Sequence, residues 1–146
     1  MRYRTISLAI ALLTSAFATA PAYALSNVTQ LTAANLDKQD AFNFTIKTEK
    51  KDDGIHFHIT IEPKGAASIS SALESNLVVM DGPTQIVSCD VAPKRTDKSV
   101  TYDFVVSDKY LEKSIFNFGN MAVVDGKPMP AGDFYWFYLG DVVKLI

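Results

Sequence analysis

Two histidines, the only ones in the chain, lie two residues apart in a stretch that alternates apolar and polar residues. In a β-strand, His56 and His58 would share one face and lie about 6.6 Å apart along the strand. Neutral imidazole is a common ligand of copper and zinc, so the pair predicts part of a transition-metal site. A third ligand would have to come from one of six other side chains: Glu62, Asn43, Cys89, Met80, Met121 or Met129. The interpretation that the pattern favours is simpler, with both imidazoles on the solvent face of an amphipathic strand.

Cys89 is the single cysteine, so the chain cannot form an intramolecular disulfide. A free thiol with a histidine base would suit nucleophilic catalysis, but such a thiol usually lies at an exposed turn or a helix N-terminus. Cys89 lies instead between Val87 and Val91 in an alternating stretch. We therefore expect a buried thiol that packs as a small apolar side chain.

An unbroken aromatic run occupies residues 134–138. Alternation along a strand would put Trp136 and Tyr138 on one face and Tyr135 on the other. A strand that is apolar on both faces needs a cover on each, which could be the chain's own loops, its N-terminal segment, a dimer partner or a flat ligand such as a sugar. The chain's own loops are the favoured cover. The alternative makes Tyr135, Trp136 and Tyr138 a binding face.

Motifs of the common enzyme classes do not occur in the sequence, including G-x-S-x-G, S-x-x-K, H-E-x-x-H, C-x-x-C and the glycine-rich phosphate loops. Paired carboxylates such as Asp52 and Asp53 lie in predicted turns, where solvated charge is the ordinary explanation. The sequence therefore predicts a protein that is not an enzyme.

Residues 1–24 have the three regions of a cleaved secretory signal peptide. Two arginines form a basic start, an apolar run spans residues 6–20, and Ala22 and Ala24 supply an A-x-A cleavage site. We therefore expect secretion, with the bacterial periplasm as the destination. No transmembrane segment is expected after cleavage, because no further apolar stretch is long enough to span a bilayer.

The charge of residues 25–146 bears on the class of partner. Loss of two of the 14 basic residues with the leader leaves 12 against 16 acidic ones, a net charge of −4. Nucleic acids and anionic membranes attract dense basic faces, so neither is expected as the main partner. The expected partner is a protein or a small ligand.

Period-2 alternation predicts strands along the whole of residues 25–146, which form one domain. It is clearest over residues 41–48 and 55–62, which flank a polar tip and predict a hairpin. Further segments are predicted as strands 77–80, 85–91, 100–106, 115–118, 121–124 and 134–139, an edge strand 142–145, and one helical turn within 107–114. About seven or eight short strands predict an all-β fold, an antiparallel two-sheet sandwich of immunoglobulin-like kind. A small closed β-barrel is the alternative.

These features together predict a secreted, non-catalytic β-sandwich that binds a protein or a small ligand. Two other hypotheses stay open. One is a periplasmic copper- or zinc-binding protein that uses His56 and His58. The other is an assembly subunit that pairs with other chains through exposed strand edges.

Overall fold

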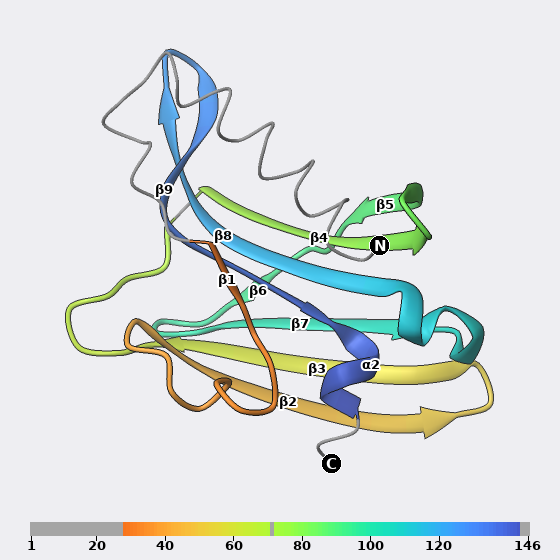
Figure 1. Cartoon of the computed structure of the whole chain (residues 1–146). Helices are drawn as coiled ribbons and strands as arrows, with labels where there is room; N and C mark the ends of the chain where they lie inside the picture. The colour runs from red at the N-terminus through yellow and green to blue at the C-terminus, as the bar shows by residue number, and fades with distance from the viewer. Residues whose placement is uncertain (1–27, 71, 144–146) are drawn as a thin grey trace.

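The computed structural model describes residues 28–70 and 72–143, so the predicted signal peptide, residues 1–24, lies outside the described residues. The described chain forms two stacked sheets with two short helices at one end (Figure 1). Neither helix is long and apolar enough to cross a membrane. The elements are β1 (Val28–Gln30), β2 (Phe42–Lys51), β3 (Gly54–Pro63), β4 (Ala72–Asp81), β5 (Thr84–Asp90), β6 (Lys94–Arg95), β7 (Val100–Val106), the 3₁₀-helix η2 (Asp108–Lys113), β8 (Ser114–Val124), β9 (Lys127–Tyr138) and α2 (Leu139–Val143).

The strand order confirms the expected fold. One sheet has the order β1-β9-β8-β4-β5 and the other the order β2-β3-β7-β6. Every pairing among the described strands is antiparallel except that of β1 with β9. In the strand letters of the immunoglobulin fold, β2-β3-β7-β6 corresponds to A-B-E-D and β9-β8-β4-β5 to G-F-C-C′. The chain is therefore a two-sheet, immunoglobulin-like sandwich, and its sheets do not close into the alternative barrel.

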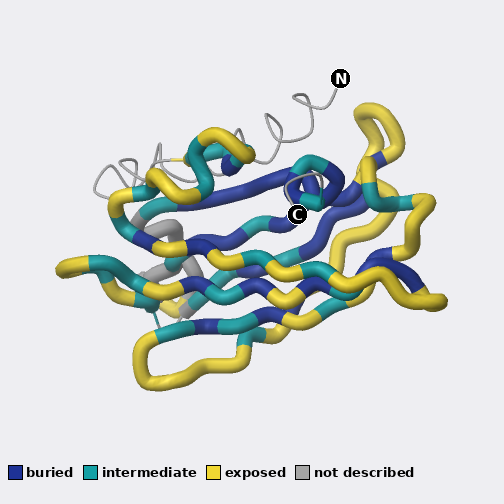
Figure 2. The backbone as a smooth tube through the Cα atoms, turned by 90° about the horizontal axis from the view of Figure 1, so that it is seen from below, coloured by how far each residue is buried: buried dark blue, intermediate teal, exposed yellow. Residues whose placement is uncertain are grey.

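The predicted hairpin forms β2 and β3. Their register runs from Phe42 opposite Pro63 to Lys51 opposite Gly54, which leaves two aspartates as the turn. Gly54 is required at this point, because its φ is +134° and a Cβ there would lie 2.5 Å from the carbonyl oxygen of Val106. The alternation of the sequence becomes an alternation of burial, which Figure 2 shows along the strands.

Aromatic rings fill much of the space between the sheets. Phe57 and Phe116 each stack on Phe104, with ring centroids 5.2 and 5.5 Å apart. Phe44 of β2 lies 4.9 Å from Tyr135 of β9 in an edge arrangement, which joins the two sheets. Such pairs add roughly 0.5–1.5 kcal/mol each to the free energy gained by burying their area. This core supports the fold without a disulfide.

The structure joins the predicted strands 115–118 and 121–124 into one continuous strand, β8, which passes through Gly119 and has a register shift between Gly119 and Met121. A Cβ at position 119 would lie 2.5 Å from the ring of Phe134 on the neighbouring strand. Gly119 therefore makes room for that ring and does not end the strand.

The prediction of an edge strand over residues 142–145 is wrong for the part that the structure describes, because Leu139–Val143 form the helix α2. Leu139 and Val142 are three residues apart and both buried, as on one side of a helix. Gly140 lies against the carboxylate of Glu112, where a Cβ would be 2.6 Å from the nearest oxygen. Packing against η2 thus favours the helix over a strand.

Candidate functional site

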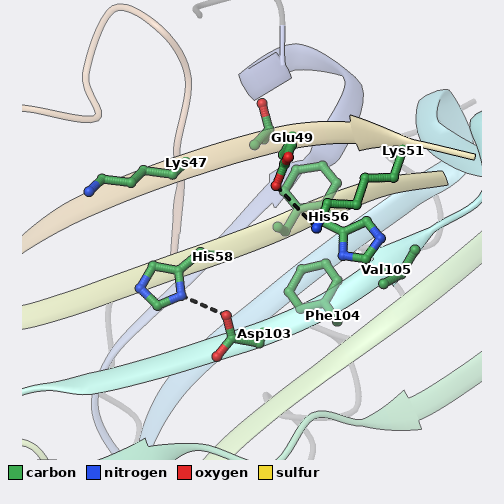
Figure 3. A pocket seen from close by; sticks show the side chains of 10 residues that line it. Lys47, Glu49, Lys51, His56, His58, Asp103, Phe104 and Val105 are labelled. Atoms are coloured by element: carbon green, nitrogen blue, oxygen red, sulfur yellow. Dashed lines mark hydrogen bonds and ion pairs between the residues drawn. The ribbon is translucent and has the colours of Figure 1, made fainter. Parts of the chain in front are cut away.

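The outer face of the four-stranded sheet carries both histidines (Figure 3). They lie on β3, between β2 and β7, and His58 is paired across the sheet with Lys47 and with Asp103. Nδ1 of His58 lies 2.6 Å from Oδ1 of Asp103, and Nε2 of His56 lies 2.6 Å from Oδ1 of Asp53. Each imidazole therefore has a carboxylate partner of its own.

These contacts change the acidity of the two carboxyls. The hydrogen bond with His56 lowers the pKa of Asp53 below its usual value, and the hydrogen bond with His58 does the same to the pKa of Asp103. Lys94, whose Nζ lies 3.3 Å from Oδ2 of Asp103, lowers the latter pKa further. The side chains of these two pairs are between about a third and two-thirds exposed to solvent, so the pairs stabilise the fold only weakly.

The two imidazoles do not converge on one point. Figure 3 shows the rings apart along β3, each beside different neighbours. Both line a shallow hollow of about 420 Å³. Within the described residues, no group of three His, Cys, Asp or Glu side chains is placed to hold a metal ion. A copper or zinc site at His56 and His58 therefore stays a prediction.

The candidate third ligands lie elsewhere. Glu62 and Asn43 are paired with each other toward the far end of the hairpin, about 13 Å along the strand from His58. Cys89 and Met80 lie in the other sheet. The side chains of the two remaining candidates, Met121 and Met129, lie outside what the structure describes.

The aromatic run divides between the two faces of the five-stranded sheet. Tyr135 lies in the core between the sheets, where burial and then Asp133 raise the pKa of its hydroxyl. Trp136 and Tyr138 pack with Val78, Met80 and Ile115 in a separate cluster on the opposite face. The three predicted binding residues are each less than a tenth exposed, and they do not form one face. Ligand binding by Tyr135, Trp136 and Tyr138 stays a prediction.

The prediction that Cys89 is buried is wrong. Cys89 pairs with Leu77, so its side chain is on the face of the sheet that the core covers at Leu77. However, β5 is the last strand of its sheet, at a margin away from β2 and β3 (Figure 1), and all seven of its residues are exposed. The alternation of Val87, Cys89 and Val91 predicts a common face correctly, but it carries no information on how far the core extends.

The outer edge of β5 differs from the other edges of the two sheets. The edge strands β1 and β6 have three and two residues, and β6 consists of Lys94 and Arg95. The edge strand β2 has ten residues, and its second half carries four charged side chains. Short strands and charged side chains are the usual protection against unwanted strand pairing.

β5 has neither protection. Its seven residues, Thr84–Asp90, include no proline and no basic residue, and their one charge is at Asp90, the last position. Ile86 and Val87 are 52% and 50% exposed. The register shift against β4 is a bulge in β5: Val87 pairs with Val79 and Gln85 with Met80, so Ile86 is an extra residue, and residues 87–90 are the regularly paired stretch of this edge. The alternating pattern alone does not predict this open edge, although six uncharged residues before Asp90 are a detectable signal.

Comparisons with known proteins leave the function to be argued from these surfaces. No family model, curated protein or solved structure matches the chain. Of the surfaces considered, the histidine face is polar and solvated, and the aromatic clusters are buried. The open edge of β5 is the surface that is both apolar and exposed.

Proposed function

We propose that the protein is a secreted, non-catalytic interaction module that binds an extended segment of another protein as an added strand beside β5. The observation that carries this proposal is the exposed, uncharged edge formed by residues 84–89. Secretion rests on the signal-peptide pattern of residues 1–24.

The backbone of β5 supports strand addition. An edge strand directs alternate N–H and C=O groups away from its sheet, and these groups form main-chain hydrogen bonds with an incoming strand. Among the described strands, β5 pairs with β4 alone. A bound segment would therefore extend the five-stranded sheet by one strand.

The side chains of β5 would add contacts on both faces of the extended sheet. Val87 pairs with Val79 and Ile86 is the unpaired bulge residue beside it, and each of the two is about half exposed. Side chains directly across a strand pair have Cβ atoms about 4.5–5.5 Å apart, which is close enough for apolar contact. The partner segment would cover apolar area that water now contacts.

The assembly-subunit hypothesis uses the same edge with a second copy of this chain as the partner. In that case the edges of two β5 strands would pair with each other. Oligomeric state separates the two hypotheses, because self-pairing depends on the concentration of this protein alone.

The experiment that tests the proposal selects binders from a library of peptides of about ten residues, a typical strand length. Selected peptides are then measured against Ile86→Lys, which places a charge on the open edge. Val105→Lys is the matched control, because Val105 is 43% exposed but lies on β7 in the other sheet. We expect at least about tenfold weaker binding to Ile86→Lys and unchanged binding to Val105→Lys. Equal binding to both variants would contradict the proposal.

A further inference from the structure

The two ends of β5 differ in chemistry, and this difference bears on the partner. We infer that the segment bound by β5 carries a basic side chain beside Asp90 and an apolar pair beside Ile86 and Val87. The inference rests on the proposed function and names the class of partner: an apolar strand with a cationic end.

The acidic end consists of two carboxylates on the outer face of the five-stranded sheet. Asp90 is paired with Asn76, and Glu74 lies two residues before Asn76, on the same face. Burial and then the Asp90 carboxylate raise the pKa of Glu74, which agrees with their proximity. Neither carboxylate belongs to an ion pair within the described part of the chain.

The described neighbours of this acidic pair across the sheet are neutral. Register places Asn117 and Gly119 of β8 beside Asn76 and Glu74, and the side chain of Asn117 donates a hydrogen bond to Asn76 at 2.7 Å. Ser88 is the preceding outward-facing residue of β5. Because no cation of the described residues pairs with these two carboxylates, their negative charge favours a cation from a binding partner.

The apolar end of β5 lies three to four residues away. A strand added to β5 would place side chains beside Ser88 and Asp90 on the outer face and beside Val87 and Cys89 on the inner face, with Ile86, the unpaired residue of the bulge, next to Val87. The complementary segment therefore has a basic residue three residue steps from an apolar residue that lies beside Val87, followed by a second apolar residue beside Ile86. This spacing is the same for a segment that binds parallel or antiparallel to β5. Reversing the direction of the segment changes only whether the basic residue precedes or follows the apolar ones.

The test uses three peptides of about ten residues that differ only at the position expected beside Asp90, which is Lys, Gln or Glu. Their affinities for the full chain are measured by fluorescence anisotropy. We expect the order Lys, Gln, Glu from tightest to weakest, with a total range of about tenfold that narrows at about 0.5 M salt. Asp90→Lys should reverse the order, whereas the control Asp97→Lys, in an exposed loop, should leave it unchanged.

The outcomes distinguish this inference from the proposed function. Equal affinities for the three peptides, all lost in Ile86→Lys, would overturn the charge rule and leave strand binding at β5 in place. If Ile86→Lys did not change the affinity of any of the three peptides, both the charge rule and strand binding at β5 would be overturned. If Asp97→Lys reversed the order of peptide affinities as Asp90→Lys does, the preference for Lys would reflect only the net charge of the protein. That result would also overturn the inference.

Discussion

The edge strands β2 and β5 are the two long edges of the sandwich, and they are built in opposite ways. β2 buries Phe42 and Phe44 in the core and carries charged residues toward its end. β5 buries none of its seven residues and carries no charge before Asp90. One edge is thus anchored inward and protected outward, whereas the other is neither.

This contrast separates stability from binding. The core holds β2 in place, so its sequence is explained by folding and by protection against strand pairing. The side chains of β5 contribute little to the free energy of unfolding, because substitutions at exposed positions away from special features usually change it only slightly. Apolar residues kept at an exposed edge are better explained by a partner than by the fold.

The largest expected effect compares one apolar truncation on each edge. Phe44→Ala should lower the free energy of unfolding by about 3–5 kcal/mol, because Phe44 is 9% exposed and contacts the rings of Tyr135 and Phe118. Val87→Ala should change it by no more than about 0.5 kcal/mol. Urea unfolding of both variants measures the difference. A loss above about 2 kcal/mol for Val87→Ala would show that β5 is buried in solution, which would break the comparison.

A smaller effect is expected at the acidic end of β5. The pKa of Glu74 is raised in the folded chain, so folding favours the neutral carboxyl, and ionisation lowers stability as the pH rises through the folded pKa. Glu74→Gln should therefore raise the urea midpoint near pH 7 and have little effect below the pKa of an unfolded glutamate, which is about 4.3. A lower midpoint near pH 7 would mean that a cation of the chain already compensates the acidic pair.

The smallest effect is expected at the histidine face. Each imidazole already contacts a carboxylate, and the rings do not converge, so excess Cu(II), Zn(II) or Ni(II) should leave the thermal midpoint nearly unchanged. His56→Ala/His58→Ala is the control. An ion at about 100 times its dissociation constant stabilises a protein by about 2.7 kcal/mol, a shift of several degrees. A rise of that size, absent from the double variant, would support the copper or zinc hypothesis.

The hairpin and the class of fold could be predicted because both depend on local pattern. Alternation around a polar tip is sufficient to predict β2 and β3, and turns at regular spacing indicate a sandwich. Gly119 shows where local pattern misleads, since it accommodates a ring of the neighbouring strand rather than a turn.

The candidate surfaces depend on strand order, which one sequence does not display. His58 meets Asp103 only because β3 pairs with β7, and the two residues are 45 positions apart. Cys89 is exposed only because β5 is the last strand of its sheet. A period-2 pattern shows which residues share a face, but the extent of the opposing layer decides whether that face is covered.

Hydrogen exchange at the two long edges tests strand binding at β5 most directly. Only alternate amides of an edge strand point outward. With the Lys peptide bound, we predict that every second amide within residues 87–90, the regularly paired stretch of β5, gains protection, while the amides of β2 exchange as before. Protection in β2, or none in β5 while the peptide is bound, would contradict the account.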